Sequence, residues 1–73
     1  MTPRFNVGDK ITIIYTQYNN LERVYPIVEV RVYPQNNNSI WYIYETSKGH
    51  HRCMLEKNID ENGKATHDKS NAS

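Results

Sequence analysis

Hydrophobic and polar positions alternate along two stretches in the middle of the chain, at residues 24–33 and 40–46. Both stretches are rich in β-branched and aromatic residues, which suit a pleated, half-buried surface. The polar segment between them, residues 35–39, contains consecutive asparagines, and asparagine tolerates the left-handed backbone of a turn. The pattern therefore predicts an antiparallel hairpin over residues 25–46, with the rest of the chain wrapped around it.

The alternation also assigns the faces of the first hairpin arm. Successive residues of a strand point to opposite sides, so the valines of this arm share one face while Glu29 and Arg31 lie on the other. We expect the valine face to be buried, because the charged pair needs water. The residues of that face are Val24, Val28, Val30 and Val32.

The second arm is apolar on both faces. Trp41 and Ile43 lie on one face, and the other face is formed by Ile40, Tyr42 and Tyr44. Such a strand is either covered on both sides or presents aromatic rings to a partner. A shift of one residue in register would exchange the two faces, so the pattern leaves the buried face open.

Shorter elements flank the hairpin. A glycine turn precedes a strand at residues 11–15, and a further short strand at residues 50–55 is followed by one helical turn at residues 56–59. Apolar residues nearly vanish after this turn, so the last segment cannot bury enough surface to offset its ordering entropy. We predict an all-β domain at residues 1–59 and a disordered polar tail at residues 60–73.

The order of these elements resembles the small SH3-like barrels, including the Tudor and KOW-type groups. Residues 5–11 read Phe-Asn-Val-Gly-Asp-Lys-Ile, which is similar to the first strand of these barrels. Residues 40–44 look like the third strand, and residues 53–59 are similar to the segment that holds a strand, a helical turn and a last short strand. The resemblance covers residues 5–59 and implies a small SH3-like β-barrel of about five strands.

The resemblance also bears on the ligand. In the peptide-binding members, a proline follows the aliphatic residue of the fourth strand, and an aromatic residue follows the helical turn. Those places hold Leu55 and Asn58 here, and the loop at residues 16–20 lacks the acidic groups that read basic peptides. These differences argue against recognition of proline-rich peptides.

The length of the chain and its net charge limit the classes of function that it could have. The 73 residues suffice for one domain, and nine lysines and arginines against eight acidic residues give a net charge of +1. This balance argues against a strong nucleic-acid or anionic-membrane binder.

The single cysteine, Cys53, cannot form an internal disulfide, and no signal peptide or membrane span is evident. We expect a cytoplasmic protein, and the abundance of Asn, Ile, Tyr and Lys is typical of AT-rich phage or mobile-element genes.

His50, His51 and Cys53 are the metal-type cluster of the sequence. Zinc sites use three or four protein ligands, and only the remote His67 could join these residues. Cys53 with His50 or His51 could suggest a nucleophile and its base, but no third side chain is evident that would orient the base. We therefore predict no metal, no cofactor and no enzymatic activity.

Aromatic side chains exceed what so small a core can hold. Exposed Tyr and Trp rings supply rigid contact area to a protein partner, including a second copy of the chain. We predict a non-enzymatic protein-binding module, such as a phage accessory protein or inhibitor. The predicted binding residues are Tyr15, Tyr18, Tyr33, Trp41, Tyr42, Tyr44, Arg31 and Arg52.

A nucleic-acid-binding barrel is the alternative interpretation. Aromatic rings interleaved with cations can stack on bases and contact phosphates. The cationic residues near the hairpin are Arg23, Arg31, Lys48, His50, His51 and Arg52. Glu22, Glu29 and Glu45 lie in the same segments and would weaken the positive field.

Overall fold

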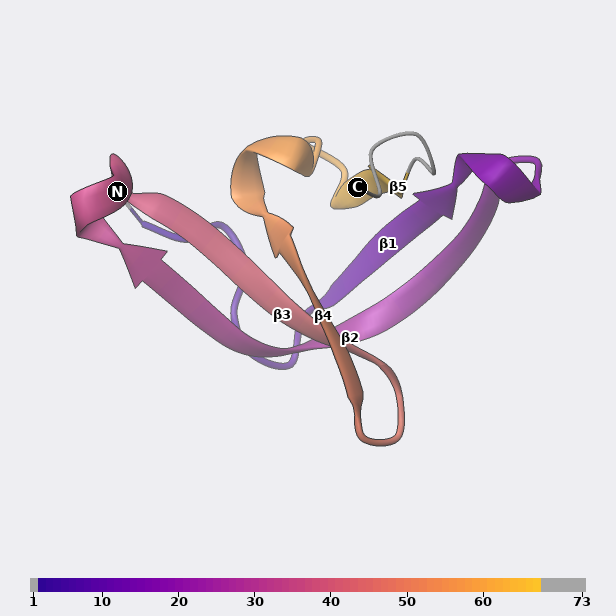
Figure 1. Cartoon of the computed structure of the whole chain (residues 1–73), viewed down its shortest axis with the longest axis horizontal. Coiled ribbons are helices and arrows are strands. Elements are labelled where there is room, and N and C mark those ends of the chain that lie inside the picture. Colours follow the sequence, from indigo (N-terminus) through magenta and orange to yellow (C-terminus); the bar gives the residue numbers. More distant parts are fainter. Residues whose placement is uncertain (1, 68–73) are drawn as a thin grey trace.

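The structure, a computed structural model, describes residues 2–67 as an all-β fold. The strands are β1 (Lys10–Tyr15), β2 (Leu21–Tyr33), β3 (Ser39–Ser47), β4 (His50–Leu55) and β5 (Lys64–His67). Short 3-10 turns are η1 (Thr16–Tyr18), η2 (Pro34–Asn36) and η3 (Glu56–Asn58). The strands form a curled, half-barrel sheet in the order β4-β3-β2-β1-β5 (Figure 1). This confirms the predicted fold class.

Strand β2 is the long central strand of the sheet and joins its two halves. Its first half pairs with β1 and its second half pairs with β3, both antiparallel. The predicted hairpin is therefore confirmed, and Asn37 and Asn38 in its turn adopt the expected left-handed conformation, each with φ of 58°. Figure 1 shows two arms that diverge from the middle of β2, with η3 and β5 between them.

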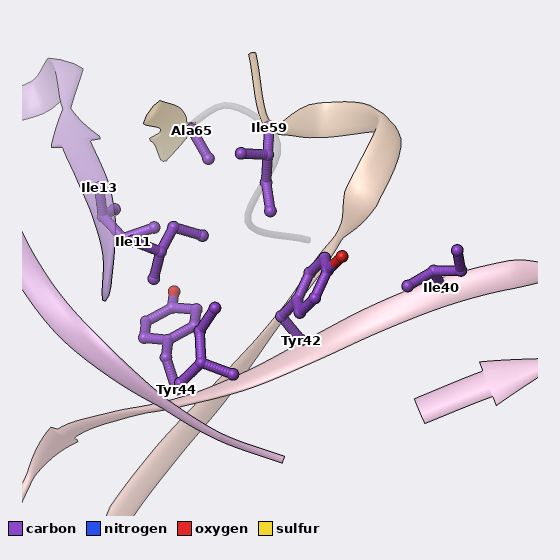
Figure 2. Close-up of a cluster of buried hydrophobic side chains, with 8 residues drawn as sticks. Ile11, Ile13, Ile40, Tyr42, Tyr44, Ile59 and Ala65 are labelled. Carbon is purple, nitrogen blue, oxygen red and sulfur yellow. The ribbon is translucent and has the colours of Figure 1, made fainter. Parts of the chain in front are cut away.

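The core lies on one side of this sheet, which we call the inner face. Strand β3 contributes Ile40, Tyr42 and Tyr44, all of which are buried. Figure 2 shows these side chains on the same side of the ribbon as the core residues from β1, β5 and the segment after η3. The structure thus settles the face that the sequence left open, and it places Trp41 and Ile43 on the opposite, outer face. The other core residues are Ile11, Ile13, Ile27, Ile59 and Ala65.

The predicted valine face is wrong over most of its length. A β-bulge shifts the register of β2 against β3 between Ile27 and Glu29, so an extra residue, Val28, reverses the alternation. Ile27 consequently points into the core at 1% exposure, whereas Val28 is 38% exposed. Val30 lies opposite Tyr42 and packs against the core, as predicted. Val24 and Val32 are exposed.

The predicted disordered tail begins too early. Strand β5 pairs in parallel with β1, and its Ala65 is 1% exposed in the core. The Asp60 carboxylate accepts hydrogen bonds from the backbone N–H groups of Asn62 and Lys64, at 2.8 and 2.9 Å, which close the turn that leads into β5. The ordered domain therefore reaches at least residue 67, and residues 68–73 of the predicted tail lie outside the described residues.

The N-terminal segment is tied to the predicted helical turn, which is confirmed as η3. The guanidinium group of Arg4 donates hydrogen bonds to the backbone carbonyl oxygens of Glu56, Ile59 and Asp60, at 3.2, 2.6 and 3.1 Å. The carbonyl oxygens of Glu56 and Asp60 also accept hydrogen bonds from the backbone N–H groups of Ile59 and Gly63, at 2.9 and 3.1 Å, so Arg4 adds a second donor to each. Within residues 2–67 no helix has the length and apolarity to cross a membrane.

Candidate functional site

The two faces of the sheet divide the predicted binding residues into two groups. Residues that pair directly across antiparallel strands project from the same face. Arg31 pairs with Trp41, which puts both on the outer face. Arg52 pairs with Tyr44, which puts both on the inner face. The predicted binding residues therefore do not lie on one face of the sheet.

The first surface is a groove on the outer face, here called the outer groove. It has a volume of about 280 Å³ and is lined by Arg31, Tyr33, Trp41, Ile43 and Cys53. The strand register assembles it, because Ile43 pairs with Glu29 on one side and with Cys53 on the other. Its centre is apolar, and the Arg31 guanidinium forms part of its edge.

An ion pair holds Arg31 beside the outer groove. The Arg31 Nε donates a hydrogen bond of 2.6 Å to a Glu29 carboxylate oxygen, and both side chains are about half exposed. This hydrogen bond lowers the pKa of Glu29 and raises the pKa of Arg31. Exposed ion pairs contribute little to stability, so its main effect is to orient the guanidinium.

The second surface is a set of aromatic rings on the inner face, here called the tyrosine cluster. Tyr25 stacks on Tyr44 with ring centroids 5.5 Å apart, and the Tyr15 hydroxyl lies 3.0 Å from the Tyr25 hydroxyl. The Tyr15 ring also contacts Tyr18 and His67, at centroid distances of 6.4 and 5.2 Å. Burial, followed by the hydrogen bond to Tyr25, raises the pKa of Tyr15. Tyr18 is 64% exposed and marks the open end of the cluster.

Two arginines flank the tyrosine cluster. Arg52 lies directly across from Tyr44, and Arg23 lies directly across from Ile13 of the core. Both side chains are exposed, and Arg23 is two residues from Tyr25 on the same strand face. The inner face at this end therefore combines phenol rings with guanidinium groups.

Tyr42 and Tyr44 do not offer a binding surface of their own, contrary to the prediction. Both are fully buried, and burial raises the pKa of each hydroxyl. The Tyr44 ring lies beneath the Tyr25 ring, while the Tyr42 hydroxyl accepts a hydrogen bond from the backbone N–H of Arg4 in the N-terminal segment. The sequence could not show this, because it left the buried face of β3 undecided.

The His-Cys cluster is spread along exposed positions of β4. His51 pairs with Glu45, with 3.8 Å between the His51 Nε2 and a carboxylate oxygen, and Cys53 belongs to the outer groove. No group of three or more His, Cys, Asp and Glu side chains in residues 2–67 is arranged to hold a metal ion. Four members of the two surfaces were not among the predicted binding residues: Tyr25, Ile43, Cys53 and His67. The register of β3 and the existence of β5 place them there, and neither follows from local pattern.

The curled five-stranded sheet is compatible with the SH3-like barrel that the sequence resembles. No protein-family model, curated protein or solved structure matches the chain. Its function is therefore inferred from the chemistry of the outer groove and of the tyrosine cluster.

Proposed function

We propose that the chain is a non-enzymatic module that binds another protein through the outer groove. The observation that supports this proposal is the grouping of Trp41, Tyr33 and Ile43 around a hollow of about 280 Å³ on the face away from the core. An apolar hollow bordered by aromatic rings suits an aliphatic or aromatic anchor side chain from a partner. Rings left partly in water at this place favour binding over a purely structural role.

The surroundings of the outer groove have the composition of a protein interface. Charged side chains lie at its edge, where Glu29 pairs with Arg31 and Glu45 lies near His51. Protein interfaces commonly combine an apolar centre with a polar rim. Val28, which precedes Glu29 at the β-bulge, is also exposed. We further propose an SH3-like barrel that acts in the cytoplasm as an accessory protein or inhibitor of a phage or mobile element.

The proposal is tested with paired variants of the full chain. Trp41→Ala removes the central ring, and Cys53→Arg fills the groove from an exposed position without touching the core. Tyr18→Ala is the matched control, because it removes an exposed ring from the other surface. Each protein is immobilised and used to capture partners from nuclease-treated lysate, and its mass is measured by light scattering after gel filtration.

We expect the parent and Tyr18→Ala to capture the same partner or to form the same oligomer. Trp41→Ala and Cys53→Arg should lose that interaction by at least tenfold, because truncated hot-spot residues commonly cost more than about 1.4 kcal/mol. Circular dichroism establishes that each variant is folded. Retention of binding by folded Cys53→Arg and Trp41→Ala proteins would refute a role for the outer groove.

A further inference from the structure

We propose that the tyrosine cluster, together with Arg23 and Arg52, is a second binding site, and that it takes single-stranded nucleic acid. It lies on the inner face, away from the outer groove, and so does not depend on the protein-binding proposal. It combines stacked rings with two exposed guanidinium groups, and the acidic residues of β2 and β3 lie on the other face of the sheet.

The strand register places the acidic residues of β2 and β3 on the outer face of the sheet. Glu22 pairs with Ile14, Glu29 pairs with Ile43 and Glu45 pairs with His51, and all of these pairs lie on the outer face. Arg23 and Arg52 pair instead with core residues, which puts them on the inner face. The three acidic residues that dilute the positive charge in the sequence are thus turned away from the two arginines.

The arginines are free to meet an anion. No carboxylate of residues 2–67 lies within ion-pair distance of the Arg23 or Arg52 guanidinium group, whereas Glu22 pairs with Lys64 at 3.6 Å and Glu29 pairs with Arg31. Burial raises the pKa of Tyr15 and Tyr44, and the positive charge of Arg52 acts in the opposite direction on both phenols. A phosphate group bound here would contact a guanidinium group and would lie beside the aromatic rings.

The rings provide a stacking surface. Tyr25 rests on Tyr44 at an interplanar angle of 22°, and the Tyr15 ring bridges toward Tyr18 and His67. The hydrogen bond between their hydroxyls restricts the motion of Tyr15 and Tyr25, and the buried Tyr44 ring lies beneath Tyr25, so little side-chain freedom is lost when a base stacks on them. Base–aromatic stacking of this kind tolerates any sequence, because every base has a flat face.

Single strands fit this surface better than duplexes. A duplex hides the faces of its bases, so it could use only the two arginines, while an unpaired strand can use the rings as well. The net charge of +1 argues against strong nucleic-acid binding but allows weak binding, since the two arginines place positive charge locally on the inner face. An acidic protein segment could also pair with the arginines, but it would offer no base to stack on the rings.

The test measures the fluorescence anisotropy of a fluorescein-labelled 15-residue oligothymidylate with the full chain. Arg52→Ala and Tyr18→Ala change the inner face, and Arg31→Ala and Tyr33→Ala are the matched controls on the outer face. We expect each inner-face variant to raise Kd at least fivefold, while the controls stay within twofold of the parent. With about two phosphate contacts, raising the salt from 50 to 200 mM should weaken binding about sevenfold.

Several results would overturn the proposal. One is a flat anisotropy signal up to about 100 μM protein in 50 mM salt, the weak end of non-specific binding. Others are an equal loss of binding in the outer-face controls, and competition by a duplex or by polyglutamate as effective as that by an unlabelled single strand. Trp41→Ala should still bind the oligonucleotide, which keeps this test separate from that of the outer groove.

Discussion

The Tyr42 hydroxyl donates a hydrogen bond to the Glu56 carboxylate, although 14 positions separate the two residues. The same oxygen accepts hydrogen bonds from the backbone N–H groups of Arg4 and Phe5, at 2.9 and 3.3 Å. Phe5 also meets the Tyr42 ring edge-on, with centroids 5.4 Å apart. One phenol therefore joins β3, η3 and the N-terminal segment, which places a polar junction at the end of an otherwise apolar core.

Removing this hydroxyl tests the junction. Tyr42→Phe should lower the free energy of unfolding by about 1–3 kcal/mol, because it leaves the Phe5 N–H group without its partner and removes one of the donors to the Glu56 carboxylate. Urea denaturation monitored by tryptophan fluorescence measures the change. Tyr33→Phe, on the outer face, is the control and should stay within about 0.5 kcal/mol of the parent. Equal losses in the two variants would contradict the role assigned to Tyr42.

Two neighbouring residues test the β-bulge. Ile27→Asp should unfold the domain, because it buries an unpaired carboxylate in a small core, whereas Val28→Asp should remain folded. Circular dichroism and thermal melting distinguish the two outcomes. If Val28→Asp unfolded and Ile27→Asp did not, the alternation would continue without a bulge and the valine face would be the buried one.

A second neighbouring pair tests strand β5. Ala65 pairs with Ile13 and also bridges Ile59, while Thr66 is exposed. Ala65→Asp should lower the melting temperature by more than about 10 °C, because a stability loss of a few kcal/mol shifts a domain of this size by that amount. Thr66→Asp should change it by only a few degrees. Similar melting temperatures for both variants would show that the segment adds nothing to the core.

Stability should fall at alkaline pH. Burial comes first among the causes that raise the pKa values of Tyr15, Tyr42 and Tyr44 above the ordinary value of 10.0. A raised folded-state pKa means that the neutral phenol is favoured by folding. The stability it contributes is complete below about pH 10 and is lost as the pH rises toward the folded-state values.

Thermal melts between pH 8 and pH 12, with phenolate absorbance at 295 nm, follow this loss. We expect a constant melting temperature up to about pH 9.5 and a steep fall above pH 10. Tyr15→Phe should make the fall shallower, while Tyr18→Phe, which alters an exposed ring, should leave it unchanged. A melting temperature that stays level from pH 9 to pH 11.5 would argue against buried, neutral phenols.

Local pattern in the sequence determined the elements of this protein. Strand-forming residues around an asparagine turn specify the β2–β3 hairpin, because backbone preference and turn chemistry act over a few residues. The turn at η3 and the strand before it follow from equally local signals. The surplus of aromatic rings over core volume likewise predicted that several rings would remain at the surface, as Tyr18 and Tyr33 do.

Tertiary structure decided which side of each strand is buried. A single extra residue at Val28 reverses the alternation of β2 where it pairs with β3, and no short window of sequence contains the pairings of β2 with its two neighbours. Strand β5 is similar: its one core residue, Ala65, is too small to mark a strand, and its partner strand, β1, is far away in the chain. The division of the aromatic residues into an outer groove and an inner cluster depends on that register. Side-chain direction in a sheet is set by pairing, and pairing joins residues that are far apart in the chain.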